Sequence, residues 1–305
     1  MSFPDRLDLQ RQDLAQVYRP QREWIDGRGL LIVVAHFFSG IGAGAWLWST
    51  LYDFRLGQLL AVFCVLALSG VAHLAFLGRW SRFWRILRRP HSSWISRGIW
   101  SIGIFGAGAC AVLLLDPGRG APVGLAVATS LVGACGILLY EGFVYASSRA
   151  ISFWRTRLLP LLYIAYGLRG GAALLLIAAA FGGDGFDVEA VETVKLWVVV
   201  STAVLVLVYL VSGSRAGGAA RESVSQLTTG RIAPSFYGGT VLAGILLPVG
   251  LALGRETLGA PDLVLLALIG LTSLVGDFYV KYCIVKAGVY VPLVGREGFR
   301  AGSRA

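Results

Sequence analysis

Residues 29–51 read GLLIVVAHFFSGIGAGAWLWSTL, a stretch without a lysine, arginine, aspartate or glutamate. About 20 apolar residues in a row are enough for a helix to cross the hydrocarbon core of a bilayer. Such stretches recur along the chain and predict eight membrane-spanning helices: 29–51, 57–77, 94–115, 122–146, 156–181, 193–212, 236–254 and 262–284. Because each span must satisfy its own backbone hydrogen bonds in lipid, and none alternates with a period of two, we predict an all-α polytopic membrane bundle.

The composition indicates the same class of protein. Hydrophobic residues make up 56% of the 305 residues and charged residues only 14%, and the mean hydropathy is +0.71. Exposing so much apolar side chain to water would cost more than the net stability of a domain. We therefore divide the chain into an amino-terminal segment (1–28), an eight-helix transmembrane domain (29–284) and a tail (285–305).

Arginine and lysine gather in alternate connections between the predicted spans. The amino-terminal segment, the connections after the second, fourth and sixth spans, and the tail, in which we count Lys281 and Lys286, are all basic. The opposite connections hold few basic residues: Arg55, Arg119 and Arg255. Because basic loops stay in the cytoplasm, we expect both termini there, in the cytoplasmic (inner) membrane of a bacterium or archaeon. The net charge of +10 then needs no nucleic acid to explain it.

Many of the 40 glycines lie inside the predicted spans, as in SGIGAGA at 39–45 and GLRGGAA at 167–173. Small residues let helix backbones approach closely in a membrane. We predict that these glycines form helix-packing surfaces. The alternative is that the flat ring of a cofactor lies against one of them.

The sequence contains no recognisable metal or nucleotide motif. Four cysteines are isolated within or at the ends of apolar spans, without C-x-x-C spacing: Cys64, Cys110, Cys135 and Cys283. This spacing excludes the usual iron–sulfur and structural zinc sites. A glycine-rich phosphate loop with its lysine is also missing, so we expect neither a metal nor a nucleotide to be bound.

A few ionisable groups lie at membrane depth, where burial of an unpaired charge is costly and often functional. At 1.5 Å per residue, His36, His73, Glu141 and Asp277 all fall in the cytoplasmic half of the predicted spans. Tyrosines lie at similar depths: Tyr140, Tyr145, Tyr163, Tyr166, Tyr279 and Tyr282. Imidazoles, carboxylates and phenols in an apolar bundle suit a quinone, whose redox change takes up or releases two protons at its carbonyl oxygens.

Other interpretations remain open for the same groups. The histidines can be packing or interfacial residues, and the carboxylates can be ion-pair partners of basic residues: Arg149, Arg169 or Lys281. One haem between His36 and His73 would make a b-type cytochrome subunit, although a relay of two haems needs four histidines. A membrane transporter or a purely structural anchor is also possible, but no repeat relates the two halves of the chain as in many transporters.

Four motifs carry a likeness to a known family. They are AHL at 72–74 leading into LGR at 77–79, PHSSWISR at 90–97, the glycine-rich FSGIGAG at 38–44, and YASSRAISFWRT at 145–156. Together they resemble the NrfD/PsrC and DmsC family through Thr156, and the number of spans extends the resemblance to the rest of the chain. One departure is that Gly98 follows Arg97, where the family often has a glutamate that Glu141 could replace here.

The resemblance implies a membrane anchor of a molybdenum or tungsten oxidoreductase that holds no metal itself. Such an anchor does not transform the organic or sulfur substrate. It exchanges electrons between ubiquinone or menaquinone and a four-cluster iron–sulfur subunit, which connects to a bis-pterin catalytic subunit. By the same resemblance, His36 and His73 lie near the quinone; we expect Tyr145 to contribute a further hydrogen bond, and Glu141 and Asp277 to relay protons.

The connection after the second span carries more arginine than orientation requires. Its basic and tryptophan side chains suit docking of the iron–sulfur subunit: Arg79, Arg82, Arg85, Arg88, Arg89, Trp94 and Arg97. The charge pattern places this face in the cytoplasm. That arrangement resembles complexes that oxidise a cytoplasmic substrate and reduce quinone, such as phenylacetyl-CoA oxidoreductases or cytoplasmic sulfite dehydrogenases.

Overall fold

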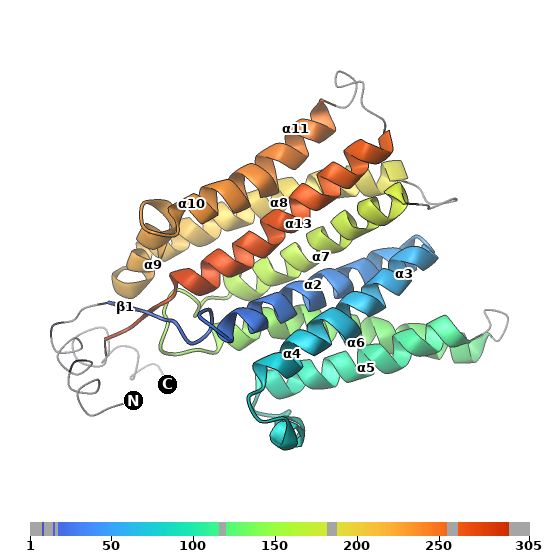
Figure 1. Ribbon diagram of the computed structural model, residues 1–305, viewed down its shortest axis with the longest axis horizontal. Helices are drawn as coiled ribbons and strands as arrows, with labels where there is room; N and C mark the ends of the chain where they lie inside the picture. The colour runs from blue at the N-terminus through green and yellow to red at the C-terminus, as the bar shows by residue number, and fades with distance from the viewer. Residues whose placement is uncertain are drawn as a thin grey trace.

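The computed structural model describes residues 8, 15, 18–115, 120–181, 188–254 and 262–292. The rest of the amino-terminal segment, residues 116–119 and 255–261 with Arg119 and Arg255, residues 182–187, and the tail beyond residue 292 lie outside the described residues. Among the residues that are described, eight helices are long and apolar enough to cross a membrane: Gly29–Leu51, Arg55–Phe76, Trp94–Leu114, Ala121–Ala146, Leu158–Ala180, Val198–Arg215, Ala233–Leu253 and Leu263–Ala287. The prediction of an all-α bundle with eight spans is confirmed (Figure 1).

Two of the eight spans are built from several helical pieces. In chain order the elements are β1 (Arg19–Pro20), α2 (Gly29–Leu51), α3 (Arg55–Val62), η1 (Phe63–Ser69), α4 (Gly70–Phe76), η2 (Trp80–Arg88), α5 (Trp94–Leu114), α6 (Ala121–Ala146), α7 (Leu158–Ala180), α8 (Val188–Arg215), α9 (Gly218–Thr228), α10 (Ala233–Ser235), η4 (Phe236–Leu246), α11 (Leu247–Leu253), α13 (Asp262–Ala287) and β2 (Val289–Tyr290). The second span joins α3, η1 and α4, and the seventh joins α10, η4 and α11. Both η1 and η4 are π-helices, a wider helical form that is frequent at functional sites.

Helices α2 and α7 lie side by side in the middle of the bundle (Figure 1). In each of them 72% of the most apolar stretch is buried, whereas this share is 22% in α5. A methyl group added at Gly44 would lie 2.1 Å from the carbonyl oxygen of Gly167, and one added at Gly171 would lie 2.2 Å from the carbonyl carbon of Gly44. The two backbones therefore meet where both lack side chains, which confirms these glycines as a packing surface.

Replacing Gly44 with alanine is expected to lower the free energy of unfolding by about 1–3 kcal/mol, because the added methyl group would force α2 away from α7. Thermal unfolding of the purified protein in detergent measures this effect. The matched control is Gly103→Ala in α5, where an added methyl group meets nothing within 4 Å. Equal unfolding temperatures for the two variants would contradict the close approach of α2 and α7.

The basic connections gather at one end of the bundle. β1 pairs antiparallel with β2, and the Val291 amide donates to the Ala150 carbonyl oxygen at 2.9 Å. The Trp154 indole donates to the Ile284 carbonyl oxygen at 3.0 Å. These bonds join the ends of the described chain to the connection after the fourth span, and η2 and α9 lie at the same end (Figure 1). The grouping agrees with the charge pattern, while the side of the membrane that this end faces stays a prediction.

The assignment of Lys281 and Lys286 to the tail is wrong. The eighth span continues three residues beyond its predicted end at residue 284, because α13 ends at Ala287. Both lysines therefore belong to the helix, and Lys281 is only 1% exposed. A buried lysine in a span cannot count as a solvated loop charge, and it must have a partner in the bundle.

Candidate functional site

His36 and His73 lie side by side toward the end of the bundle that carries the basic connections. His36 comes from the first half of α2 and His73 from α4, and their ring centroids are 5.7 Å apart. His36 is 2% exposed, and His73 is half-buried. The structure therefore brings together the two histidines that the sequence predicts as hydrogen-bond partners of a quinone.

A hydrogen-bond network orients both imidazoles. The Nδ1 atom of His36 lies 3.0 Å from the Tyr145 hydroxyl. The Nδ1 atom of His73 lies 2.9 Å from the Ser69 carbonyl oxygen, which can only accept, so we assign a proton to this nitrogen. In the neutral ring the Nε2 atom of His73 then carries the lone pair. The Tyr140 hydroxyl, 3.4 Å from this Nε2 atom, makes a long contact in which it is the donor.

Tyr140 contacts both histidines, although the sequence did not single it out from the other tyrosines. Its ring meets the ring of His36 edge-on, with 5.5 Å between the centroids. A methyl group added at Gly98 would lie 2.3 Å from the Tyr140 ring. Gly98 therefore leaves the space that the Tyr140 ring fills.

A buried ion pair lies beside the imidazoles. The Glu141 carboxylate and the Lys281 ammonium are 2.6 Å apart, with side-chain exposures of 0% and 1%. Lys281 also donates to the main-chain oxygen of His36 at 2.7 Å. The Ser39 hydroxyl donates to the other Glu141 oxygen at 2.6 Å. A methyl group added at Gly40 would lie 2.6 Å from the ammonium nitrogen, so glycine at this position makes room for the pair against α2.

A second buried ion pair joins the other half of the bundle. The Arg169 Nε atom and an Asp277 carboxylate oxygen are 2.9 Å apart, and both side chains are fully buried. Arg169 also donates to the Thr202 hydroxyl at 3.2 Å and to the Gly244 carbonyl oxygen at 2.5 Å. Its guanidinium carbon lies 4.9 Å from the centre of the Tyr166 ring. These contacts tie α7 to α8, η4 and α13.

The ion-pair interpretation of the two buried carboxylates is thus confirmed. Glu141 pairs with Lys281 and Asp277 pairs with Arg169. Pairing of both charges lowers the cost of holding them at membrane depth. The Glu141–Lys281 pair lies beside the histidines, because Lys281 contacts His36. Asp277 is connected to that site through Lys281, which follows it by one helical turn in α13.

The geometry of the histidines favours hydrogen bonding to a polar group over ligation of a haem iron. A haem between the rings would need one nitrogen of each histidine. The Nδ1 atom of His73 is held by Ser69, and its Nε2 atom faces the Tyr140 hydroxyl, which would have to move away. Among the residues that the structure describes, no group of three or more histidine, cysteine, aspartate or glutamate side chains could hold a metal ion.

Comparison with known proteins agrees with the sequence motifs. The family model described as "Polysulphide reductase, NrfD" matches residues 28–292. The chain belongs to this family. The C subunit of polysulfide reductase from Wolinella succinogenes is 32% identical over 125 residues, an alignment that covers 39% of this chain and 39% of that relative. The resemblance drawn from the sequence motifs is confirmed: the chain is a multi-pass membrane protein of the NrfD family.

The predicted docking residues separate into two groups. The first group consists of exposed arginines at and around η2: Arg79, Arg82, Arg85, Arg88 and Arg89. Trp84 lies among them with 49% of its surface exposed, and the Arg88 guanidinium lies 4.6 Å from the centre of its ring. This group forms the η2 surface, a basic and aromatic face beside the end of the second span.

The second group holds the connection in place. The Trp94 ring stacks on Phe143 with 4.3 Å between the centroids. The Arg97 guanidinium lies 4.2 Å from the centre of the Trp94 ring and donates to the carbonyl oxygens of Pro90 and His91, each at 2.8 Å. Because these two side chains contact their own chain, we expect the η2 surface to contribute most of any charge to a docked partner.

Proposed function

We propose that this chain is the quinone-reactive membrane subunit of an oxidoreductase complex and exchanges electrons between the quinone pool and a docked iron–sulfur subunit. The observation that carries the proposal is the buried cluster of His36, His73, Tyr140 and Tyr145, with the Glu141–Lys281 ion pair beside it. Membership in the NrfD family supports it independently. A purely structural anchor would not need two adjacent imidazoles and two phenols at membrane depth.

The imidazoles and phenols would hold the quinone by hydrogen bonds to its carbonyl oxygens. If Tyr145 donates to the Nδ1 atom of His36, the opposite ring nitrogen, Nε2, carries a proton that can be donated to a carbonyl oxygen. The Tyr140 hydroxyl would donate to the other carbonyl by leaving its long contact with the Nε2 atom of His73. His73, whose own proton is bonded to Ser69, would accept from a hydroxyl of the reduced quinone through Nε2. When bound, the quinone, as ubiquinone or menaquinone, supplies two-electron redox chemistry coupled to two protons.

Protons would reach or leave the site through Glu141 and Lys281. The Glu141 carboxylate accepts from Ser39 and Lys281, and Lys281 also touches the main chain of His36, so the pair is continuous with the histidine that we assign to the quinone. Asp277 lies one turn further along α13 and is the more remote member of the proposed relay. Because the cluster lies toward the end with the basic connections, protons and electrons would be handled on one side of the membrane.

The partners and the orientation belong to the same proposal. The η2 surface would dock a four-cluster iron–sulfur subunit, which would connect to a catalytic subunit with a molybdenum or tungsten bis-pterin centre. The basic end of the bundle would face the cytoplasm. A cytoplasmic substrate, such as phenylacetyl-CoA or sulfite, would then be oxidised on the catalytic subunit while quinone is reduced on this chain.

Reversing the charge of Arg82, Arg85 and Arg88 together to glutamate is expected to release the soluble subunits from the membrane while the protein still inserts. Like charges across a docking face cost several kcal/mol. Co-purification at moderate salt measures the effect. The control is the same reversal at Arg215 and Arg221, exposed arginines at the α8–α9 connection. Retained partners in the triple variant would refute docking at the η2 surface.

Purification of the protein from its native membranes tests the whole proposal. We expect iron–sulfur and pterin-bearing subunits to accompany it, and the isolated complex to reduce or oxidise a short-chain quinone. A protein that purifies alone and drives uptake of a solute into vesicles would favour a transporter instead. A haem absorption band in the purified protein would favour the cytochrome alternative.

A further inference from the structure

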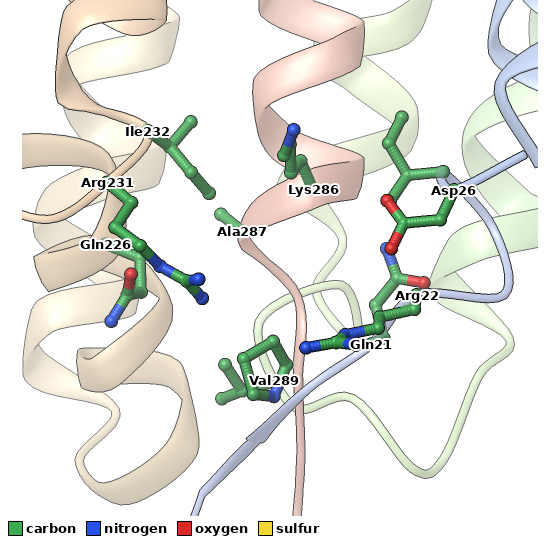
Figure 2. A pocket seen from close by; sticks show the side chains of 11 residues that line it. Gln21, Arg22, Asp26, Gln226, Arg231, Ile232, Lys286, Ala287 and Val289 are labelled. Atoms are coloured by element: carbon green, nitrogen blue, oxygen red, sulfur yellow. The ribbon is translucent and has the colours of Figure 1, made fainter.

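A cavity of about 340 Å³ lies at the basic end of the bundle, between β1, α9 and the last turn of α13. Figure 2 shows its charged walls: Arg22 and Asp26 come from the segment before α2, Arg231 from the turn before α10, and Lys286 from α13. The volume falls within the range of small-molecule sites. Its lining includes neither histidine of the proposed quinone site, so the cavity is a separate feature.

Positive charge dominates this cavity. Three cations and one carboxylate, that of Asp26, line it, which leaves a net charge of two positive units. Two further carboxylates nearby are not part of its lining. Glu23 accepts from the Tyr290 hydroxyl at 2.6 Å, which lowers the pKa of Glu23, and Glu222 accepts from the Gln226 amide at 2.8 Å. The cavity is therefore suited to an anion.

The cavity lies at the ends of the first and eighth spans, where we expect the surface of the membrane. Lys286 lies in the last turn of the eighth span, and Arg22 lies seven residues before the first span begins. Apolar side chains line the same cavity beside the charges: Ile25, Ile232 and Val289. Basic pockets between transmembrane helices at the membrane surface are suited to lipid head groups, with polar and apolar parts of the lipid meeting at this depth.

We infer that this cavity binds the phosphate head group of an anionic phospholipid. The guanidinium groups of Arg22 and Arg231 reach in from opposite walls and match the paired oxygens of a phosphodiester. Lys286 adds positive charge to the same cavity, and its ammonium donates to the Tyr282 hydroxyl at 2.5 Å. The apolar wall at Ile25 accommodates the glycerol and the start of the acyl chains.

The bound lipid would stabilise a wall that packs against the histidine site. The Gln21 amide donates to the Val285 carbonyl oxygen at 2.5 Å and so ties this wall to α13. Trp24, three residues on, meets the Tyr145 ring edge-on with 5.7 Å between the centroids. Tyr145 in turn contacts His36. Occupancy of the cavity therefore supports the segment that lies over the proposed quinone site.

The test is a titration of the full-length protein, purified in its complex, with dioctanoyl phosphatidylglycerol, and native mass spectrometry counts the lipids bound. In the double variant Arg22→Gln/Arg231→Gln we expect the dissociation constant to rise about tenfold or more, a loss of at least 1.4 kcal/mol. The control is Arg215→Gln/Arg221→Gln, which removes the same charge at the same end and should bind as the unaltered protein does.

Several outcomes would overturn the inference. An unchanged dissociation constant in the double variant would mean that the lipid binds elsewhere. Equal binding of dioctanoyl phosphatidylcholine would remove the role of net charge, and equal binding of glycerol 3-phosphate would assign the cavity to a soluble phosphate. If the double variant does not accumulate, the single variant Arg231→Gln decides, because this exposed side chain can be shortened without exposing the core; unchanged binding in it contradicts the assignment.

Discussion

Substitution of His36 by leucine is expected to lower quinone-dependent turnover of the complex by about 10²-fold or more, the usual contribution of a positioned proton donor or acceptor. Leucine keeps similar bulk in the core but cannot donate to a quinone carbonyl or bond to Tyr145. Reduction of an artificial dye should stay near the level of the unaltered complex, because dyes take electrons from the soluble subunits. The ratio of the two activities measures the effect.

The control for this prediction is the same substitution at His91. That residue is exposed in the connection after the second span, outside the hydrogen-bond network of His36 and His73. His91→Leu should retain both activities. Retention of quinone turnover in His36→Leu and in Glu141→Gln alike would place the quinone elsewhere in the bundle.

Substitution of Lys281 by methionine is expected to destabilise the protein by about 3–5 kcal/mol, because it leaves the Glu141 carboxylate buried without its cation. Methionine has a similar length and no charge. Thermal unfolding in detergent and the amount of inserted protein both measure the loss. An unfolding temperature equal to that of the unaltered protein would show that Glu141 does not depend on this partner.

The double variant Glu141→Gln/Lys281→Met separates a structural role of the pair from a role in proton transfer. Removal of both charges should recover most of the stability that Lys281→Met loses, since neutral side chains of similar size can replace a buried ion pair. Quinone-dependent turnover should nevertheless stay low if the pair carries protons. Recovery of both stability and turnover would show that the pair has only a structural role.

The spans could be predicted from the sequence because lipid imposes one simple requirement, about 20 apolar residues with internally satisfied backbone bonds. The same reasoning gives the depth of each residue in the membrane, and it predicts that His36, His73 and Glu141 lie in the same half of the bilayer. It does not give the direction in which each side chain leaves its helix axis or which helices are neighbours. The contact of His36 with His73 depends on both, and so does the pairing of Asp277 with Arg169.

Tyr140 and Lys281 show which parts of the site the sequence leaves open. Six tyrosines lie at similar depth, and only the packing of the Tyr140 ring onto Gly98 distinguishes the one that contacts both histidines. Lys281 follows Asp277 by one helical turn inside an apolar stretch, which was a usable signal of a buried partner. From the sequence, Lys281 is both a possible ion-pair partner of a buried carboxylate and a charge of the tail, and its contact with Glu141 decides for the ion pair.

Labelling of the complex with a photoreactive short-chain quinone, followed by mapping of the labelled peptides, would locate the quinone directly. The predicted result is saturable labelling of the peptides that carry His36, His73 and Tyr140, blocked by excess unlabelled quinone and lost in His36→Leu. An apolar groove of about 410 Å³ lies toward the other end of α2, lined by Leu47, Trp48 and Leu131 among others. This groove is the alternative place for the quinone. Saturable labelling confined to that groove, unaffected by His36→Leu, would contradict a quinone site at the histidines.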